Sequence, residues 1–187
     1  MTRAVFLDRD GVINRAIVRE GKPFPPASLG ELEILPDVHE ALTLLRTAGY
    51  RNIVVTNQPD VRTGKQQREV VETMHRHLLE ALPLDGIRVC YHIEQDGCDC
   101  RKPKPGLLVQ AASEFGIDLP ASFMVGDRWR DVLAGQAAGC YSFFVDLGYR
   151  ERRPEPPYTL VTSLLDAARA IVQAVSHRQP LGRTPDE

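Results

Sequence analysis

Two aspartates, Asp8 and Asp10, follow the first apolar run of the chain and lie two positions apart. Because side chains alternate along a strand, we expect both carboxylates to face one side and Arg9 to face the other. Two carboxylates about 4 Å apart repel by about 4 kcal/mol at an effective dielectric constant of about 20. A bound divalent cation would offset this repulsion. The pair therefore predicts a metal-assisted catalytic site, with a polar turn after a strand as the alternative.

Polar side chains also follow three later apolar runs, NIVVT, IRVCY and SFMVG. In open parallel sheets, ligands bind at the carboxyl ends of the strands, so these positions are candidates for a common site. Each residue alone has an ordinary alternative role as a helix cap, a solvated charge or a turn residue. Together they carry the groups needed to hold a phosphate and a cation. They are Thr56, Asn57, Gln58, Lys102, Asp127 and Asp131.

Short apolar runs alternate with amphipathic segments along most of the chain. The runs predict strands at 4–8, 52–56, 87–91, 122–126 and 141–146. The amphipathic segments predict helices at 36–49, 66–82, 104–116, 128–139 and 163–175. This order predicts the α/β class, with a three-layer, Rossmann-like parallel sheet, helices on both faces and right-handed crossovers. We expect the last helix to pack on the outside.

The length of 187 residues suits a single domain, which we expect to span 1–176. The segment 14–36 contains several Gly and Pro residues, is too long for a minimal turn and directly follows the aspartate pair. We expect it to overhang the site as a substrate loop. The chain has no long insertion that would form a separate cap domain. The polar tail 177–187 is predicted to be disordered.

The charge balance gives no electrostatic case for binding nucleic acid or an anionic membrane, because the formal net charge is only -2. No apolar run approaches the roughly 20 residues that span a bilayer. The first apolar run is cut by the two aspartates, so it does not fit a signal peptide. We therefore expect a cytoplasmic location, where cysteines stay reduced. In that setting four cysteines indicate metal binding or core packing before disulfides.

Three cysteines and a histidine lie within eleven residues, at Cys90, His92, Cys98 and Cys100. This set suits a closed, tetrahedral zinc site, which would be structural and would staple the loop 90–102. The alternatives are a disulfide between Cys98 and Cys100 or four residues without a common role. A bound Zn²⁺ would also hold the basic pair that directly follows the last of these cysteines.

Four stretches together carry a resemblance to a known family: FLDRDGVIN, VVTNQ, CDCRKPKPG and MVGDRWRD. In this order they resemble the four motifs of the haloacid-dehalogenase-type phosphatases, over residues 4–145. Within that superfamily of hydrolases the chain most resembles the heptose bisphosphate phosphatases and the histidinol-phosphate phosphatases. These share the T-N-Q stretch and the cysteine-rich zinc loop, and in this subgroup loops rather than a cap domain shape the pocket.

The resemblance implies a role for each motif residue. Asp8 would be the nucleophile that forms an aspartyl-phosphate, and Asp10 would be the general acid and base, which requires a raised pKa. Thr56 and Lys102 would stabilise the transferring phosphoryl oxygens. Mg²⁺ would be held by the carboxylates of Asp8 and Asp127 and by the backbone carbonyl of Asp10.

Some residues keep open or ordinary roles. Asp131 either orients Lys102 or metal-bound waters, or lies in the first turn of a helix, where carboxylates are favoured. Cys140 is interpreted as a buried core residue, and Trp129 as a packing residue or part of the pocket rim. The remaining histidines, interpreted as structural or solvated, are His39, His75, His77 and His177.

The resemblance implies a small phosphorylated metabolite as substrate and a monomeric enzyme of carbohydrate metabolism. D-glycero-D-manno-heptose 1,7-bisphosphate, losing its 7-phosphate, is the first candidate, because extra positive charge at Arg101 and Arg128 would hold a second phosphate. Asn57 and Gln58 are further candidate substrate-binding residues. The chain departs from the heptose type after T-N-Q, where Pro59, Asp60 and Val61 follow, and it lacks the polar stretch that contacts the sugar.

Two alternatives follow from these departures. The first is a histidinol-phosphate phosphatase, in which Asp60 or Glu20 would pair with the amine and imidazole of the substrate. The second lies outside enzymes, as a phosphate-binding interaction module. The presence of Asp8, Asp10, Lys102 and Asp127 together argues against the second alternative, because pure binding needs no second carboxylate beside the nucleophile.

Overall fold

Six parallel strands form the central sheet of the computed structural model, which describes residues 2–177 and, at 175–177, the backbone alone. The order across the sheet is β5-β4-β1-β6-β7-β8, so the first strand of the chain lies between two later ones. Every pairing in this sheet is parallel. The strands are β1 (Arg3–Leu7), β4 (Tyr50–Asn57), β5 (Gly86–Cys90), β6 (Phe123–Gly126), β7 (Tyr141–Val145) and β8 (Thr159–Val161).

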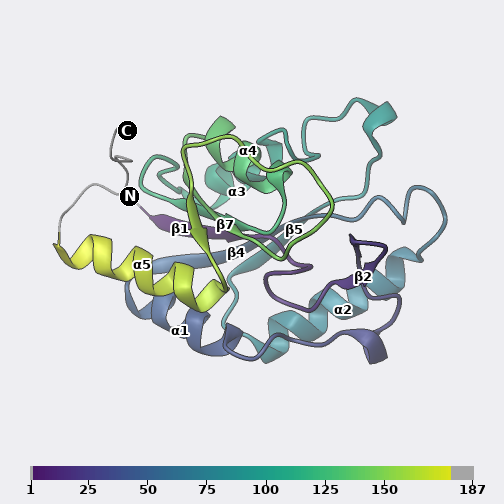
Figure 1. The fold of residues 1–187 in the computed structure, drawn as a ribbon, viewed down its shortest axis with the longest axis horizontal. Helices are drawn as coiled ribbons and strands as arrows, with labels where there is room; N and C mark the ends of the chain where they lie inside the picture. The colour runs from purple at the N-terminus through teal and green to yellow at the C-terminus, as the bar shows by residue number, and fades with distance from the viewer. Residues whose placement is uncertain (1, 178–187) are drawn as a thin grey trace.

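Helices cover both faces of this sheet (Figure 1). α1 and α5 pack on each other and lie with α2 on one face, whereas α3 and α4 cover the other face. The helices are α1 (Val38–Thr47), α2 (Arg68–Ala81), α3 (Gly106–Phe115), α4 (Trp129–Ala137) and α5 (Leu164–His177), with short 3-10 helices η1 (Leu29–Glu31) and η2 (Glu94–Asp96). The three-layer arrangement predicted from the alternating pattern is confirmed.

The sheet is buried on both faces because its central strands are apolar at nearly every position. In β1, Val5 and Leu7 belong to the core on the α1 and α5 side, whereas Ala4 and Phe6 belong to the core on the α3 and α4 side. Parallel strands covered by helices read as continuous apolar runs for this reason. Each fully buried large aliphatic or aromatic side chain contributes about 1.5–3 kcal/mol to folding. The two cores fix the strand ends that carry the polar residues.

The C-terminal part of the sheet contains one strand that the sequence pattern did not predict. β8 has only three residues, and its central Leu160 is 55% exposed, so no apolar run marks it. α5 lies in the outer layer, as expected, and its inner face belongs to the core, where Ala167, Ala168 and Ile171 are fully buried. The predicted disordered tail lies outside the described residues from 178 onward, and His177 is the last residue of α5.

A small hairpin stands between β1 and α1. Its strands β2 (Ile17–Arg19) and β3 (Lys22–Phe24) pair antiparallel with each other and form a separate two-stranded sheet. The two residues of its turn, Glu20 and Gly21, both have positive φ, at 52° and 78°. Such a two-residue turn matches the twist of the flanking strands. The segment 14–36 is thus an ordered hairpin followed by η1, and no larger insertion interrupts the described part of the chain.

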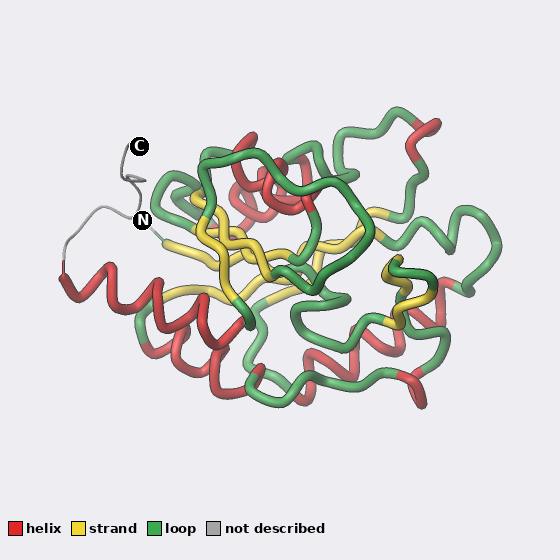
Figure 2. Tube along the Cα trace, viewed as in Figure 1, coloured by secondary structure: helices red, strands yellow, loops and turns green. Residues whose placement is uncertain are grey.

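The loops that follow the strands gather at one end of the sheet, on the right in Figure 2. Because all six strands are parallel, their carboxyl ends meet there. β1 ends at Leu7, before the aspartate pair, so the prediction that strand alternation orients Asp8, Arg9 and Asp10 is wrong. The backbone turns after Leu7, and the three side chains are placed by that turn instead. Among the described helices, none is both long and apolar enough to cross a membrane.

Candidate active site

The ends of β1 and β4, the loop after β5 and the start of α4 surround a cavity of about 210 Å³. The β2–β3 hairpin contributes a wall made of Pro23, Phe24 and Pro25. The segment that the sequence places over the aspartate pair therefore does line the cavity. The residues of the predicted site that line it are Asp8, Asp10, Thr56, Asn57, Lys102, Arg128 and Asp131.

Lys102 joins three of these strand ends through its buried ammonium group. Its Nζ donates hydrogen bonds to Asp8 Oδ1 at 2.8 Å and to the carbonyl of Val55 at 2.7 Å, and it forms an ion pair with Asp131 Oδ1 at 2.6 Å. An ammonium has three N–H donors, so these contacts use all of them. Burial alone would lower the pKa of Lys102, but the charges of Asp131 and Asp8 outweigh it and raise the pKa. The side chain is therefore a fixed cation beside Asp8.

Asp131 fills both of the roles that the sequence left open. Its Oδ1 pairs with Lys102, while its Oδ2 accepts a hydrogen bond from the backbone N–H of Arg128 at 2.9 Å. The second contact caps the first turn of α4, where a carboxylate also meets the positive end of the helix dipole. One residue thus ties the start of α4 to the lysine.

Three carboxylates crowd together beside this lysine. Asp8, Asp127 and Asp131 each offer an oxygen atom within 4.8 Å of the others. Burial and the charge of Asp131 raise the pKa of Asp8 to about 6, although Lys102 opposes the shift. Burial and the charge of Asp8 raise the pKa of Asp127 well above its ordinary value. Such a set of hard oxygen ligands fits a divalent cation.

Asp127 is the carboxylate of the three that is free to bind a cation. Both of its oxygens are buried, and neither has a hydrogen-bond partner within the described residues. Both oxygens of Asp131, in contrast, are engaged by Lys102 and by the start of α4. Buried carboxylate oxygens are costly without partners. The donor set therefore favours Asp8 and Asp127 as the carboxylate ligands of a metal ion.

Gly11 makes the approach of Asp127 possible. A Cβ at this position would lie 1.9 Å from Asp127 Oδ2, and the backbone of Gly11 has a φ of +91°. Any side chain would therefore clash with the carboxylate, and the backbone conformation itself favours glycine. This explains why the second aspartate of the pair is followed directly by glycine.

The Asp10 carboxylate is held in an arrangement that differs from the sequence prediction. Arg9 folds back onto it, with Nη2 at 2.9 Å from Oδ1 and 3.0 Å from Oδ2, and Asn14 and Gln58 each donate one further hydrogen bond. Burial would raise the pKa of Asp10, but the charge of Arg9 and these hydrogen bonds lower it. The expected raised pKa is thus wrong here, because the sequence does not reveal that Arg9 turns toward its neighbour.

His75 extends this network onto α2 and was missed as a partner of the site. Arg9 is fully buried, and its Nη1 lies 2.9 Å from His75 Nε2. A guanidinium has no acceptor, so His75 Nε2 must accept the hydrogen bond and carry no proton. Burial and the charge of Arg9 lower the pKa of His75 to about 3. No sequence signal links these two residues, which are 66 positions apart.

Asn57 and Gln58 are directed toward other residues of the predicted site. The Asn57 amide accepts a hydrogen bond from the backbone N–H of Lys102 and donates one to its carbonyl, both at 3.1 Å. Gln58 is buried, and its Nε2 donates to Asp10 Oδ2 at 2.8 Å and to the hydroxyl oxygen of Thr56 at 3.0 Å. Asn57 thus fixes the backbone of the lysine, and Gln58 links the threonine to Asp10.

Three arginines lie around the cavity, and they differ in what they contact. Arg128 lines it and forms a two-point ion pair with Glu151. Arg130 also lines it. The sequence did not indicate this role, because nothing in the motif around Arg130 distinguishes it from a solvated charge. Arg101 donates to the carbonyl of His92 at 3.0 Å and lines a neighbouring cavity of about 200 Å³. That second cavity shares Lys102 and Arg130 with the first.

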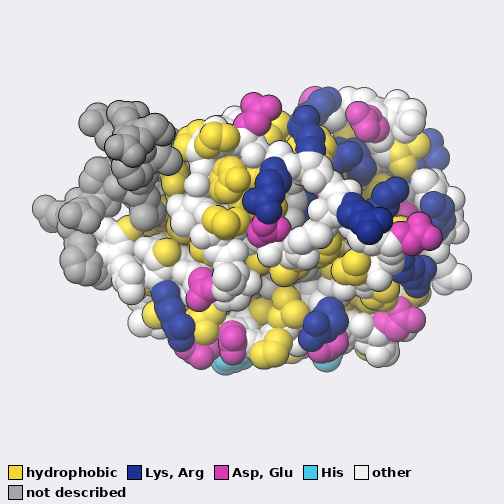
Figure 3. All heavy atoms as spheres, in the orientation of Figure 1, with side chains coloured by type: hydrophobic (Ala, Val, Ile, Leu, Met, Phe, Trp, Pro, Cys, Tyr) yellow, Lys and Arg dark blue, Asp and Glu magenta, His cyan; other side chains and the backbone are white. Residues whose placement is uncertain are grey.

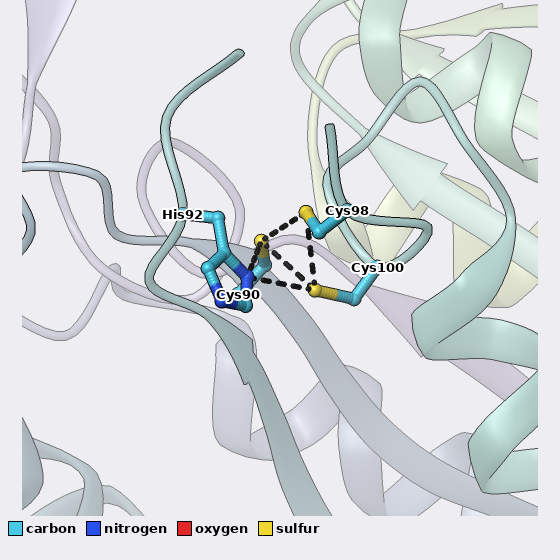
Figure 4. Close-up of side chains that lie close together, drawn as sticks. All are labelled: Cys90, His92, Cys98 and Cys100. Carbon is cyan, nitrogen blue, oxygen red and sulfur yellow. Dashed lines mark hydrogen bonds between the residues drawn. The ribbon is translucent and has the colours of Figure 1, made fainter. Parts of the chain in front are cut away.

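The cysteine loop brings its four predicted ligands together, as Figure 4 shows. Cys100 Sγ lies 3.1 Å from Cys90 Sγ and 3.5 Å from Cys98 Sγ, and His92 Nδ1 lies 3.3 Å from Cys100 Sγ. Zinc–sulfur bonds of about 2.3 Å in a tetrahedron place sulfurs about 3.8 Å apart. The cluster therefore has the size and the donor set for one tetrahedral zinc ion. All four cysteines of the chain are free thiols, and Cys140 is buried in the core as predicted.

Comparison with known proteins gives consistent matches. The family model described as HAD-hydrolase-like matches residues 99–167. The D-glycero-beta-D-manno-heptose-1,7-bisphosphate 7-phosphatase of Pseudomonas aeruginosa PAO1 is 36% identical over 181 residues, which cover 94% of this chain and 99% of that protein. The protein of the same name from Helicobacter pylori J99 is 40% identical over 141 residues, covering 71% of this chain and 76% of that protein.

A solved structure supports the same relationship. The D,D-heptose 1,7-bisphosphate phosphatase from B. bronchiseptica, in complex with magnesium and phosphate, superposes with a TM-score of 0.79 and 28% sequence identity. The match covers 92% of this chain and 99% of the other. The likeness thus extends over nearly the whole chain.

Proposed function

Because this chain belongs to the family of D-glycero-beta-D-manno-heptose-1,7-bisphosphate 7-phosphatases, which are HAD-like hydrolases, we propose that it removes the 7-phosphate of that heptose bisphosphate. The observation that carries the proposal is the contact between Lys102 and Asp8 beside the unpartnered carboxylate of Asp127. A nucleophile and a fixed cation that line one cavity, with a free metal ligand within 4.8 Å of the nucleophile, are what phosphoryl transfer needs.

Asp8 is the nucleophile in this proposal. Its carboxylate attacks the phosphorus atom, the bond from phosphorus to the sugar oxygen breaks, and an aspartyl-phosphate forms. Lys102 holds Asp8 in position and adds positive charge next to the transferring group, and the Thr56 hydroxyl binds one of its oxygens. Water then cleaves the aspartyl-phosphate and releases inorganic phosphate.

Asp10 is the proton carrier for both steps. It gives a proton to the leaving sugar alkoxide and then takes one from the attacking water. The lowered pKa of its carboxyl, which lies between Arg9, Asn14 and Gln58, suits the second task, because the group is then an available base. For the first task the carboxyl must gain a proton before the alkoxide leaves.

Magnesium fits the first of the two metal sites. We propose that the carboxylates of Asp8 and Asp127 and the backbone carbonyl of Asp10 hold it, in keeping with the magnesium in the B. bronchiseptica relative. A bound Mg²⁺ supplies positive charge that offsets the repulsion between carboxylates and phosphate. Zn²⁺ fits the second site, where Cys90, His92, Cys98 and Cys100 would hold it as a structural ion.

We propose a cytoplasmic, monomeric enzyme whose phosphatase domain spans 1–176 and whose partner is a small phosphorylated sugar. Arg101 and Arg128 remain candidates for binding the second phosphate, together with Arg130, which also lines the cavity. In this proposal Asn57 positions Lys102 and Gln58 positions Asp10. Asn57 also lines the cavity.

A second candidate substrate is histidinol phosphate. Asp60 lines the cavity together with Pro59 and the apolar wall of the hairpin, and among the described residues its carboxylate forms no ion pair or hydrogen bond. A carboxylate beside an apolar wall suits a cationic, ring-bearing phosphate ester. The substrate test therefore includes both compounds.

The test measures release of inorganic phosphate with and without Mg²⁺ from heptose 1,7-bisphosphate, heptose 7-phosphate, a sugar 1-phosphate and histidinol phosphate. We expect Mg²⁺-dependent turnover, with the bisphosphate preferred by at least about tenfold in kcat/KM. Asp8→Asn should lower kcat by at least about a thousandfold, because it removes the nucleophile while the fold remains. Preference for histidinol phosphate would replace the proposed substrate, and an active Asp8→Asn protein would contradict the mechanism.

A further inference from the structure

The β2–β3 hairpin forms one wall of the cavity but is poorly supported by its own packing. It is separate from the main sheet, its strands have three residues each, and Val18 and Phe24 are 55% and 39% exposed. An isolated two-stranded hairpin is marginally stable in water. A wall that positions a substrate therefore needs support from elsewhere in the chain.

The tip of the hairpin contacts the loop that follows β7. The backbone N–H of Arg150 donates a hydrogen bond to the carbonyl of Gly21 at 2.8 Å. A Cβ placed on Gly21 would lie 2.7 Å from Arg150 Cγ and 2.8 Å from its Cδ, so the aliphatic part of this side chain lies directly against the glycine. In Figure 1 the loop after β7 arches toward the hairpin labelled β2.

The residues on either side of Arg150 attach the same loop to the metal and α4 side of the cavity. The Tyr149 hydroxyl lies beside the carboxylate of Asp127. Glu151 forms the two-point ion pair with Arg128, and the Arg152 guanidinium stacks 3.5 Å above the ring centre of Trp129. Glu151 and Arg152 are thus anchored on residues 128 and 129 and Tyr149 lies next to residue 127, while Arg150 itself reaches the hairpin.

We propose that residues 149–152 form a clasp that joins the start of α4 to the hairpin tip, and that Arg150 is a positioning residue for the substrate wall. The clasp acts through the aliphatic part of Arg150 and through its backbone N–H, because these are the parts that contact Gly21. It keeps Pro23, Phe24 and Pro25 against the cavity. This role deepens the proposed function and rests on it for the identity of the substrate.

The test compares Arg150→Ala with Arg150→Met. Alanine removes the atoms that lie against Gly21, whereas methionine keeps an aliphatic side chain of similar reach and removes the charge. The matched control is Arg153→Ala, because Arg153 pairs with Asp146 and not with the hairpin. Hydrogen exchange of the backbone amides at 17–24 is measured in each full-length protein. KM and kcat are measured with heptose 1,7-bisphosphate and with acetyl phosphate, which is too small to span the cavity.

Arg150→Ala should speed exchange at 17–24 and raise KM for the bisphosphate about five- to tenfold, with kcat changed less than about twofold and acetyl phosphate turnover unchanged. Arg150→Met and Arg153→Ala should match the unsubstituted protein. Unchanged exchange in Arg150→Ala would overturn the clasp. The proposal would also be overturned if Arg150→Met raised exchange and KM as much as Arg150→Ala does, because the charge of Arg150 rather than its packing would then matter. If the bisphosphate is not a substrate at all, the exchange measurement still decides the clasp independently of the proposed function.

Discussion

Lys102 is held in place at both its side chain and its backbone, in a site that has no cap domain. Its ammonium is fixed by Asp8, Asp131 and the carbonyl of Val55, and its backbone is fixed on both sides by the amide of Asn57. With every donor of the ammonium in use, we expect its charge rather than a free N–H to act on a bound phosphate. A fixed charge of this kind needs little reorganisation during the reaction, which is the basis of electrostatic catalysis.

The neutral, buried His75 makes folding stability depend on pH. Its pKa is about 3 in the folded protein, because of burial and Arg9, and is about 6.5 in an unfolded chain. Between these values the unfolded chain binds a proton that the folded protein does not. This part of the stability is therefore complete above pH 6.5 and is lost as pH falls toward 3, at up to about 1.4 kcal/mol per pH unit.

We predict that His75→Gln makes unfolding free energy fall less steeply between pH 7 and pH 4.5 than in the unsubstituted protein, measured by urea denaturation. Glutamine still offers Arg9 an acceptor but does not titrate. The raised pKa values of Asp8 and Asp127 act in the opposite direction, so the difference between the two proteins is the relevant quantity. His77→Gln, on the exposed side of the same helix, is the control. Equal slopes for all three proteins would contradict the assignment.

The turn after β1 carries Asp8 and Asp10, the proposed nucleophile and proton carrier, and Gly11, which admits Asp127. We predict that Gly11→Ala weakens Mg²⁺ binding at least about tenfold, because a Cβ at Gly11 would lie 1.9 Å from Asp127 Oδ2. The measurement is the dissociation constant of Mg²⁺ from isothermal titration calorimetry. Gly64→Ala is the matched control, since Gly64 also has a positive φ, +73°, but no atom within 4 Å of a Cβ.

Backbone strain alone costs about 1–2 kcal/mol at both glycines. If Gly64→Ala weakened Mg²⁺ binding as much as Gly11→Ala, strain elsewhere in the fold would explain the loss. The contact with Asp127 would then have no special importance. A Mg²⁺ affinity in Gly11→Ala equal to that of the unsubstituted protein would also show that the contact with Asp127 is unimportant.

The cysteine loop places the proposed zinc ligand Cys100 two positions before Lys102. We predict that Cys100→Ser lowers the zinc content, measured by atomic emission on the isolated protein, from about one ion per chain to well below that. It should also lower kcat, because Lys102 then loses one support. Cys140→Ser should keep the zinc, since Cys140 is buried in the core and lies outside the cluster. An unsubstituted protein isolated without zinc would contradict the prediction.

The sequence predicted the features that depend on residues close together along the chain. The apolar runs gave the five long strands and their carboxyl ends, and the close spacing of Cys90, His92, Cys98 and Cys100 gave the cluster. The sequence did not predict contacts between distant segments. Arg9 meets His75 across 66 positions, and Arg128 meets Glu151 across 23. Such contacts depend on how the chain turns after each strand, which no local periodicity records.

At the scale of the whole molecule, the loops around the cavity form a continuous ring of contacts. Gln66 donates to the carbonyl of Ala27, and Arg62 pairs with Asp96 in the cysteine loop. Lys102, at the end of that loop, pairs with Asp131 of α4. Arg128 pairs with Glu151, and the backbone N–H of Arg150 donates to Gly21 at the hairpin tip, which completes the ring. Each exposed ion pair contributes at most about 1 kcal/mol. Their arrangement matters more than their individual strength, because the ring surrounds a wall whose two-stranded sheet is separate from the main sheet.

The balance of charge in the molecule is uneven around this ring. The chain as a whole has a formal net charge of -2, yet Lys and Arg side chains gather on the face of the molecule where the loops lie, on the right in Figure 3. The cavity itself is different. It is lined by four carboxylates, at Asp8, Asp10, Asp60 and Asp131, and by three cations, at Lys102, Arg128 and Arg130.

A phosphate therefore meets a cavity with an excess of negative charge until Mg²⁺ binds. Among the described residues that line the cavity, Asp60 is the carboxylate that forms no side-chain hydrogen bond or ion pair, so no protein cation neutralises it. We predict that Asp60→Asn lowers KM for heptose 1,7-bisphosphate about three- to tenfold, equivalent to about 1 kcal/mol of relieved repulsion. With histidinol phosphate, whose amine is cationic, the same substitution should raise KM, because an attraction is lost. Steady-state kinetics with both compounds at constant ionic strength provide the measurement. An equal change in KM for the two substrates would show that Asp60 does not face the part of the substrate that differs between them.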